Sequence, residues 1–312
     1  MQDNLRELIE DAYVKTGIHA GLIEKDYYVT RLVKLISPIN NEYFKLIFGG
    51  GTCLAKAHGI TKRMSEDIDF KVIKKDIDII GKKTQRKEFR KLKESIVEVL
   101  KNTEFKCSPR PTEGRNNHLK IDISYPAIFP RAHNAREDVL LELTISEAKM
   151  PVCHLSVNTL IQDCLGNDSK LDTCELECVS VEETAAEKWV ALTRRVAEAV
   201  RYSKAEDDRR ALIRHIYDLF MIENQSQLSE VFFSLAKKIV HIDKEQYKKH
   251  KEYYNDPINE IYYSLELLKG VEFKNYYNEF LEVYLYEKKQ PPFYSEALKI
   301  VEKISVPIIA SL

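Results

Sequence analysis

Two aspartates separated by one residue, Asp67 and Asp69, are the best candidates in this 312-residue chain for binding a metal ion. They lie in the segment SEDIDFKVIK, whose alternating polar and apolar residues are typical of a half-buried β-strand. Because residues two apart on a strand point to the same side, the two carboxylates would converge on a shared divalent cation. Hard oxygen ligands of this kind suit Mg²⁺ or Mn²⁺. The same spacing recurs at Asp76 and Asp78, to which we assign no role, because surface strands often carry alternating acids.

A run of three glycines precedes these acids, between a short apolar segment and a predicted helix. Gly49, Gly50 and Gly51 would let backbone amides approach a ligand closely. The N-terminus of the helix would add free N–H groups and the positive end of its dipole, and Thr52 could add a hydroxyl donor. The pattern indicates a phosphate site, although a glycine run considered alone is more often only a tight turn.

A phosphate-binding turn followed by a strand with paired acids is the minimal equipment for transferring a nucleotidyl group. Metal ions would bridge the attacking and leaving oxygens, and the helix end would take up charge on the pyrophosphate. A third acid on a neighbouring strand would act as general base or as a ligand of a second metal. We expect Asp122, in HLKIDISY, to be this acid, with Glu142 in VLLELTIS as the alternative. Either residue could instead be an ordinary strand acid.

The segments that must position these residues predict a mixed α/β block followed by helices. Apolar residues recur at helical spacing in the first forty residues, which predicts two helices, the second ended by Pro38. Strands are expected within 44–50, 65–74, 118–125, 138–146 and 174–181, and helices over 51–59 and 82–101. Ser180 and Glu183 form a capping-box pattern that opens a series of helices. We therefore predict an α+β fold, with a mixed β-sheet flanked by helices over 1–180 and a mostly helical domain over 181–312.

The segment from Gly49 to Phe70, GGGTCLAKAHGITKRMSEDIDF, resembles the signature of nucleotidyltransferases of the DNA polymerase beta superfamily. That signature has glycine-glycine-Ser/Thr, a helix and then D-x-D. More narrowly, the segment is similar to the AbiEii/AbiGii toxin family, which includes the MenT toxins and has the patterns G-G-T-x-L-x-K and R-x-S-x-D-x-D-F. The matching residues are Gly50, Gly51, Thr52, Leu54 and Lys56 in the first pattern and Arg63, Ser65, Asp67, Asp69 and Phe70 in the second.

The resemblance continues downstream in two helical motifs, A-x-E-K-x-x-A-L-x-x-R and R-D-x-Y-D-L. The chain matches them at Ala185, Glu187, Lys188, Ala191, Leu192 and Arg195, and at Arg214, Tyr217, Asp218 and Leu219. Only the resemblance implies that Lys188 binds triphosphate and that Asp218 belongs to the site, since spacing alone would single out neither. The chain departs from the family at His215, where the family usually has Asp.

The resemblance implies a toxin with a nucleotidyltransferase-like fold that uses an NTP and Mg²⁺, with Mn²⁺ as an alternative ion. Lys56 and Arg63 would bind phosphate, although Arg63 could equally cap the sheet edge through an ion pair. Ser65 would bind phosphate or be modified itself. The resemblance also implies an RNA acceptor, such as the 3′ end of tRNA, and a separate antitoxin protein as partner. Transfer to a protein side chain, or a nucleotide- or RNA-binding module without turnover, are the alternatives.

Composition and charge give weaker indications of the binding partners than these motifs do. The 48 basic and 49 acidic residues give a formal net charge of -1, which does not by itself indicate a nucleic-acid partner. No apolar run approaches the ~20 residues of a membrane-spanning helix, and the N-terminus is polar and acidic. We therefore expect a cytoplasmic protein without membrane contact. Tyrosines interleaved with lysines after residue 246 could stack on RNA bases, but the core of amphipathic helices is the favoured interpretation.

Overall fold

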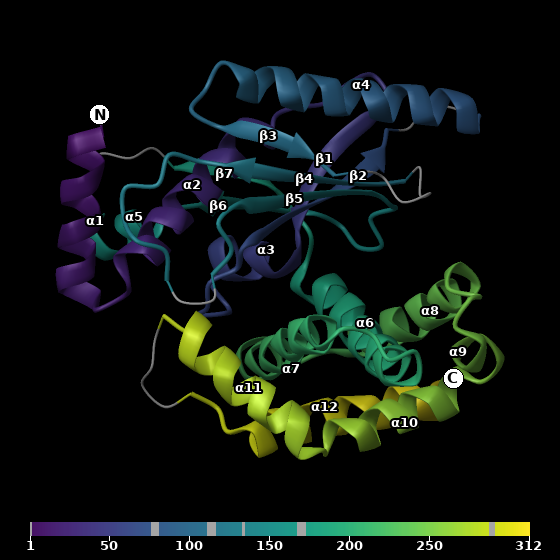
Figure 1. Ribbon diagram of the computed structural model, residues 1–312. Helices are drawn as coiled ribbons and strands as arrows, with labels where there is room; N and C mark the ends of the chain where they lie inside the picture. Colours follow the sequence, from purple (N-terminus) through teal and green to yellow (C-terminus); the bar gives the residue numbers. More distant parts are fainter. Residues whose placement is uncertain (1, 76–80, 111–116, 133–134, 167–172, 287–290) are drawn as a thin grey trace. The chain divides into compact units, whose positions relative to one another are not determined.

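The computed structural model describes residues 2–75, 81–110, 117–132, 135–166, 173–286 and 291–312 (Figure 1). The chain divides into two compact units, the first comprising Met1–Gly59 and Arg63–Ser180 and the second Ile60–Lys62 and Val181–Leu312. The repeated acids Asp76 and Asp78 lie outside the described residues. No helix in the described part of the chain is long and apolar enough to span a membrane.

The first unit is built around a mixed sheet with flanking helices, which confirms the predicted α+β fold class. In the described residues the sheet has seven strands in the order β3-β4-β5-β2-β1-β7-β6. The strands are β1 (Phe44–Gly49), β2 (Asp67–Lys74), β3 (Lys106–Pro109), β4 (His118–Ser124), β5 (Val139–Ile145), β6 (Cys153–Val157) and β7 (Cys174–Cys178). The helices are α1 (Gln2–Thr16), α2 (Ala20–Ile36), α3 (Gly50–Lys56), α4 (Lys82–Lys101) and α5 (Leu160–Leu165). Strands β3 and β6 were not predicted from the sequence; they are short, with four and five residues.

Strand β2 lies inside the sheet, antiparallel to β1 and parallel to β5. The register places Asp67 beside Leu140 and Asp69 beside Glu142. Strand β4 follows on the far side of β5, antiparallel to it, with Asp122 opposite Leu140. Residues paired in this way share a face of the sheet, so the acids of β2, β5 and β4 all lie on one face.

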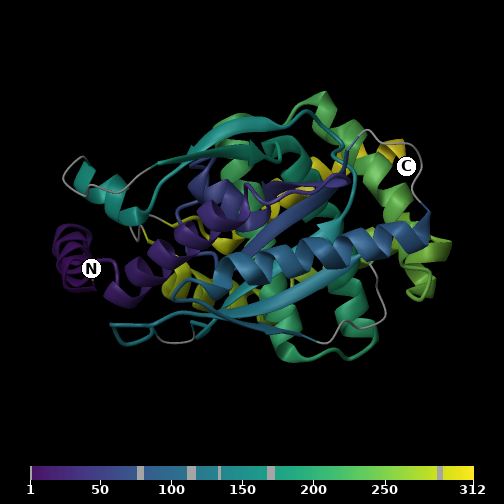
Figure 2. The ribbon, with the colours of Figure 1, turned by 90° about the horizontal axis from the view of Figure 1, so that it is seen from above.

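The other face of the sheet is apolar and is covered by α4. Ile68, Phe70 and Val72 are almost fully buried, as the predicted alternation of β2 requires. Phe44 of β1 lies on the same face and packs edge-on against Phe89 of α4, with ring centroids 6.4 Å apart. Figure 2 shows α4 running across the sheet on this side. Burial of this face fixes the register of β2 and turns Asp67 and Asp69 to the opposite face, where α3 begins.

In the described residues, the elements of the second unit from Val181 onwards are all helices, which confirms the predicted C-terminal helical region. Its helices are α6 (Val181–Arg201), α7 (Glu206–Ser226), α8 (Glu230–Gln246), α9 (Lys251–Asn255), α10 (Pro257–Leu268), α11 (Val271–Tyr284) and α12 (Tyr294–Ser311). Helix α6 packs against α7, α8 and α10, and its fully buried Trp189 donates a hydrogen bond to Ser305 Oγ of α12 at 2.8 Å. Tyr253, Tyr277 and Tyr294 are buried, which favours the core interpretation for these late tyrosines.

Candidate active site

Gly50, the first residue of α3, lies directly against the carboxylate of Asp69. Gly50 has φ +71°, a left-handed conformation that residues with a side chain rarely adopt. A Cβ atom added at Gly50 would collide with the Asp69 carboxylate. The preceding residue, Gly49, is the cross-strand partner of Asp69 in the sheet. The start of a helix and an acid of the predicted pair are therefore brought together by a contact that only glycine permits.

The next glycine, Gly51, is packed against the residues that precede the acids. A Cβ atom at Gly51 would lie 2.6 Å from Arg63 Nη2 and 3.2 Å from Ser65 Oγ. Arg63 is only 1% exposed and donates a hydrogen bond to the carbonyl of Met64 at 3.0 Å. This burial favours a role for Arg63 in supporting the glycine turn over the predicted role as a phosphate clamp. Ser65 is also buried, beside the same turn.

Thr52 holds α3 to the strand that carries the acids. Its side chain is buried, and the hydroxyl donates a hydrogen bond to the backbone carbonyl of Asp67. The sequence led us to expect this hydroxyl to donate to a phosphate. In the fold it instead fixes the position of Asp67 relative to the helix N-terminus.

Asp67 and Asp69 share one face of β2 and are both half-buried. The guanidinium of Arg136 lies at this face, with Nη1 3.1 Å from Asp67 Oδ1. In the described part of the chain, no three His, Cys, Asp or Glu side chains are grouped so as to hold a metal ion. Two carboxylates on one face nevertheless fit Mg²⁺, which commonly binds through one or two carboxylates and completes its shell with water and substrate phosphates.

The two candidates for a third acid differ in their distance from this pair. Glu142 is the immediate lateral neighbour of Asp69, whereas Asp122 is separated from Asp67 by the whole of strand β5. Neighbouring strands lie about 4.8 Å apart, so Asp122 is about two strand spacings, or about 10 Å, from Asp67. By proximity the structure favours Glu142, the reverse of the preference drawn from the sequence. The parallel pairing of β5 with β2, which brings Glu142 beside Asp69, is a tertiary feature that neither strand's sequence reveals.

Both candidate acids already have basic partners. Arg110 makes a two-pronged ion pair with Asp122, with N–O distances of 2.6 and 2.7 Å, and this contact holds the pKa of the Asp122 carboxyl below its usual range. Glu142 is paired with Lys120 and lies 3.6 Å from His118 Nε2. Asp122 is therefore held as a carboxylate by Arg110, an arrangement better suited to orienting that arginine than to accepting a proton.

Lys56, predicted to bind phosphate, forms a buried ion pair. Its ammonium group contacts Asp26 of α2, and the two side chains are only 8% and 4% exposed. The second oxygen of Asp26 accepts a hydrogen bond from the backbone N–H of Leu160 at 2.6 Å. Burial raises the pKa of the Asp26 carboxyl, which the ion pair counteracts. Through this ion pair Lys56 joins α3 to α2 and, by way of Asp26, to α5; its contact with phosphate stays a prediction.

Three consecutive charged residues of α2, Glu24, Lys25 and Asp26, are buried, and the sequence reasoning missed all three. Each ties α2 to another segment. Glu24 accepts hydrogen bonds from the backbone N–H groups of Ile128 and Phe129, at 2.6 and 3.0 Å. A charged triplet inside a helix whose other residues are mostly apolar is the sequence signal that could have indicated this role.

Lys25 belongs to a network that ends at Asp67. Its ammonium lies 2.7 Å from Glu66 Oε1 and donates a hydrogen bond to the carbonyl of Arg136 at 2.6 Å. Glu66 Oε1 also accepts from the backbone N–H of Arg136 at 2.6 Å. The buried Lys25–Glu66 pair therefore forms hydrogen bonds with both the N–H and the carbonyl of Arg136. The side chain of Arg136 in turn contacts Asp67. Burial lowers the pKa of the Lys25 amine, and the Glu66 carboxylate counteracts this shift.

In the second unit, the structure brings together Lys188 of α6 and Asp218 of α7. Lys188 Nζ lies 2.8 Å from Asp218 Oδ2, and the side chains are 8% and 0% exposed. His215 lies one helical turn before Asp218, and its Nδ1 is buried without a hydrogen-bond partner. Burial, reinforced by the charge of Lys188, lowers the pKa of the His215 imidazole well below its usual value. This imidazole is therefore neutral at physiological pH.

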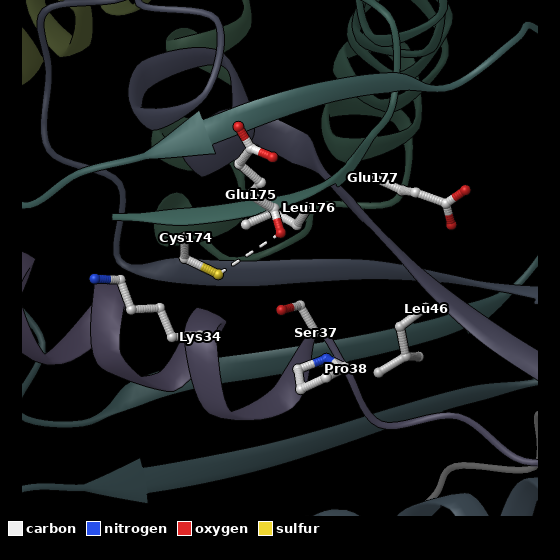
Figure 3. Close-up of a pocket in the computed structure, with 8 residues that line it drawn as sticks. All are labelled: Lys34, Ser37, Pro38, Leu46, Cys174, Glu175, Leu176 and Glu177. Atoms are coloured by element: carbon white, nitrogen blue, oxygen red, sulfur yellow. Dashed lines mark hydrogen bonds between the residues drawn. The ribbon is translucent and has the colours of Figure 1, made fainter. Parts of the chain in front are cut away.

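A surface cavity of about 190 Å³ lies elsewhere in the first unit, where the end of α2 meets β1 and β7 (Figure 3). Its lining residues are Lys34, Ser37, Pro38, Leu46, Cys174, Glu175, Leu176 and Glu177. No predicted site residue lines it, and Glu177 is held by an ion pair with Lys45 at 2.9 Å. The predicted carboxylates Asp67 and Asp69 lie on β2 and not in this cavity.

Most of the chain matches a known protein family. Residues 40–298 match the family described as "Nucleotidyl transferase AbiEii toxin, Type IV TA system". A solved structure, MenT4, a nucleotidyltransferase toxin from Mycobacterium tuberculosis H37Rv, is similar at 17% identity and a TM-score of 0.43, over 72% of this chain and 74% of that one. A comparison with curated proteins gave no match.

Proposed function

Because the chain belongs to the AbiEii nucleotidyl transferase toxin family, we propose that it transfers a nucleotide from an NTP to an acceptor hydroxyl in a Mg²⁺-dependent reaction. The observation that supports this most directly is the contact of Gly50 with Asp69. It places a helix N-terminus, which favours phosphate oxygens, against a carboxylate that favours a divalent cation. A nucleoside triphosphate carrying Mg²⁺ needs these two kinds of group side by side.

Asp67 and Asp69 are proposed to bind the metal, which when bound would polarise the α-phosphate and stabilise the pyrophosphate leaving group. The free N–H groups at the start of α3 would take up phosphate charge. Thr52 and the Arg63–Ser65 segment hold this turn in place from behind. Glu142, the neighbour of Asp69, is the better placed candidate for activating the acceptor hydroxyl, with Asp122 as the alternative.

Lys188 and Asp218 are proposed to serve the same reaction. This assignment rests on their match to the family's helical motifs and on the buried 2.8 Å contact that they make with one another. Asp218 would fix the position of the Lys188 ammonium, and the ammonium would neutralise phosphate charge.

The family description places these proteins in Type IV toxin–antitoxin systems. We propose accordingly that the acceptor is RNA, specifically the 3′ end of tRNA, that transfer inhibits translation and growth, and that a cognate antitoxin protein opposes the activity. The protein is expected to act in the cytoplasm, where tRNA and nucleoside triphosphates are available.

The acceptor and the nucleotide can be identified together. Purified protein, total tRNA and Mg²⁺ are incubated with each α-labelled NTP in turn, and the products are divided into nuclease-treated and protease-treated halves. The proposal predicts label that is sensitive to nuclease, abolished in Asp67→Asn and retained in Asp11→Ala, a change at an exposed acid of α1. Label that resists nuclease but not protease would identify a protein acceptor. Nucleotide binding with no pyrophosphate release would contradict the enzymatic assignment.

A further inference from the structure

Arg195 of α6 has an unusual environment for an arginine. The residue is half-buried, yet its guanidinium makes no hydrogen bond or ion pair with any described residue. Burial lowers its pKa, and the neighbouring charge of Arg194 adds to this effect. Arg194 itself is held by Asp243 at 2.6 Å and Glu198 at 2.9 Å. A partly desolvated charge without a counter-ion is unfavourable, so a negatively charged group would be favoured beside Arg195.

His215 offers a second unsatisfied polar group close by. Its Nδ1 is buried with no hydrogen-bond partner. The charged groups that act most strongly on this imidazole are the cations Lys188, Arg195 and Arg214 and the acid Asp218. A neutral imidazole protonated on Nδ1 could donate one hydrogen bond there without carrying charge.

Helix geometry brings these groups onto one surface. Helices α6 and α7 are joined by only four residues and lie side by side within the second unit (Figure 1), so they run antiparallel. The Lys188–Asp218 contact sets their register. Arg195 lies seven residues beyond Lys188, or about two turns and about 10 Å along α6 on the same face. His215, three residues before Asp218, then falls between Lys188 and Arg195.

The carboxylates nearest this surface are already occupied. Asp218 is paired with Lys188, and Glu198 is paired with Arg194 at 2.9 Å and with Lys204 at 2.8 Å. The surface formed by Lys188, Arg195 and His215 therefore presents several hydrogen-bond donors, and the positive charge of Arg195 has no ion-pair partner among the described residues. An arginine fork and a lysine ammonium are suited to multiply charged phosphate oxygens.

We propose that Lys188, Arg195 and His215 form a binding site for a short phosphate chain, with Arg195 as its main anchor. The identification of that chain as the substrate triphosphate, or the pyrophosphate released from it, rests on the proposed function. Binding of the anion itself does not require catalysis and can be measured separately.

The test is calorimetric titration of the full-length protein with tripolyphosphate, without divalent metal and at constant ionic strength. Arg195→Gln should weaken binding at least about tenfold, or about 1.4 kcal/mol, and Arg195→Lys should retain part of the affinity. The matched control Arg210→Gln removes the same charge from an exposed position on α7 and should leave affinity within about twofold. Equal affinity in Arg195→Gln and wild type, or no binding by wild type, would overturn the proposal.

Thermal unfolding separates loss of the site from loss of the fold. Because Arg195 makes no hydrogen bond or ion pair with a residue that the structure describes, Arg195→Gln without ligand should unfold at the wild-type temperature or above it. Tripolyphosphate should raise the unfolding temperature of wild type but not of this variant. The Asp69→Asn variant, in which Arg195 is intact, should still bind tripolyphosphate. If Asp69→Asn abolishes this binding and Arg195→Gln does not, the proposed position of the site is wrong. Absence of nucleotide transfer alongside Arg195-dependent binding would refute the proposed function and leave the anion site standing.

Discussion

Replacing Gly50 with alanine tests the contact between the glycine turn and Asp69. Gly50 has φ +71°, and a side chain in this left-handed region costs about 1–2 kcal/mol. For a unit of this size that corresponds to a fall of about 2–8 °C in unfolding temperature. The added Cβ would also collide with the Asp69 carboxylate and force it to move. Since a displacement of about 1 Å in a reacting group can lower the rate about a hundredfold, we expect at least that loss of nucleotide transfer.

Gly59 provides a matched control for this change. It has φ +66°, but a Cβ atom there would meet no other atom within 4 Å. Gly59→Ala should therefore show a similar fall in unfolding temperature by calorimetry while keeping transfer of labelled nucleotide near the wild-type rate. If Gly50→Ala retains as much activity as Gly59→Ala, the proximity of the turn to Asp69 has no part in catalysis.

Three further changes test other parts of the structure. Lys25→Met should lower the free energy of unfolding by about 3–5 kcal/mol in denaturant titrations, because it leaves Glu66 buried without its cation; an unchanged midpoint would contradict the network. Arg136→Gln should tighten Mn²⁺ binding measured by electron paramagnetic resonance, because the guanidinium 3.1 Å from Asp67 competes with a cation; weaker binding would show that it supports the metal instead. The pKa of His215 is depressed in the fold, so the unfolded chain takes up its proton first and stability falls as pH drops below about 6.5. In His215→Gln, the free energy of unfolding should fall less steeply with decreasing pH between about pH 5 and 6.5 than in wild type. An identical slope would show that His215 does not cause this pH dependence.

The carboxylate face of β2 was predictable because local sequence determines it. Asp67 and Asp69 alternate with Ile68 and Phe70, and burial of the apolar pair leaves only one face for the acids. The glycine run predicted the helix start for a similarly local reason, since the positive φ of Gly50 excludes most other residues. Local patterns of this kind establish which residues share a face, but not what lies opposite them.

The remaining parts of the site depend on contacts between distant segments. The preference for Asp122 over Glu142 was reversed because β5, which follows β4 in the chain, pairs with β2 and separates Asp122 from Asp67. The phosphate role predicted for Lys56 did not allow for Asp26, thirty residues earlier in the chain, whose burial requires a cation. No spacing rule connects such residues, because their proximity arises only when the helices and the sheet have packed.

The central claim is that Asp67 and Asp69 form the metal-binding face of a nucleotidyltransferase. The rate of label transfer from an α-labelled NTP to tRNA in Mg²⁺, compared between wild type and Asp69→Asn, tests it most directly. Removing one metal-binding carboxylate should raise the barrier by about 4 kcal/mol, and so lower the rate about a thousandfold, while the unfolding temperature stays close to that of wild type. Transfer by Asp69→Asn at the wild-type rate would show that the paired acids of β2 do not carry the reaction.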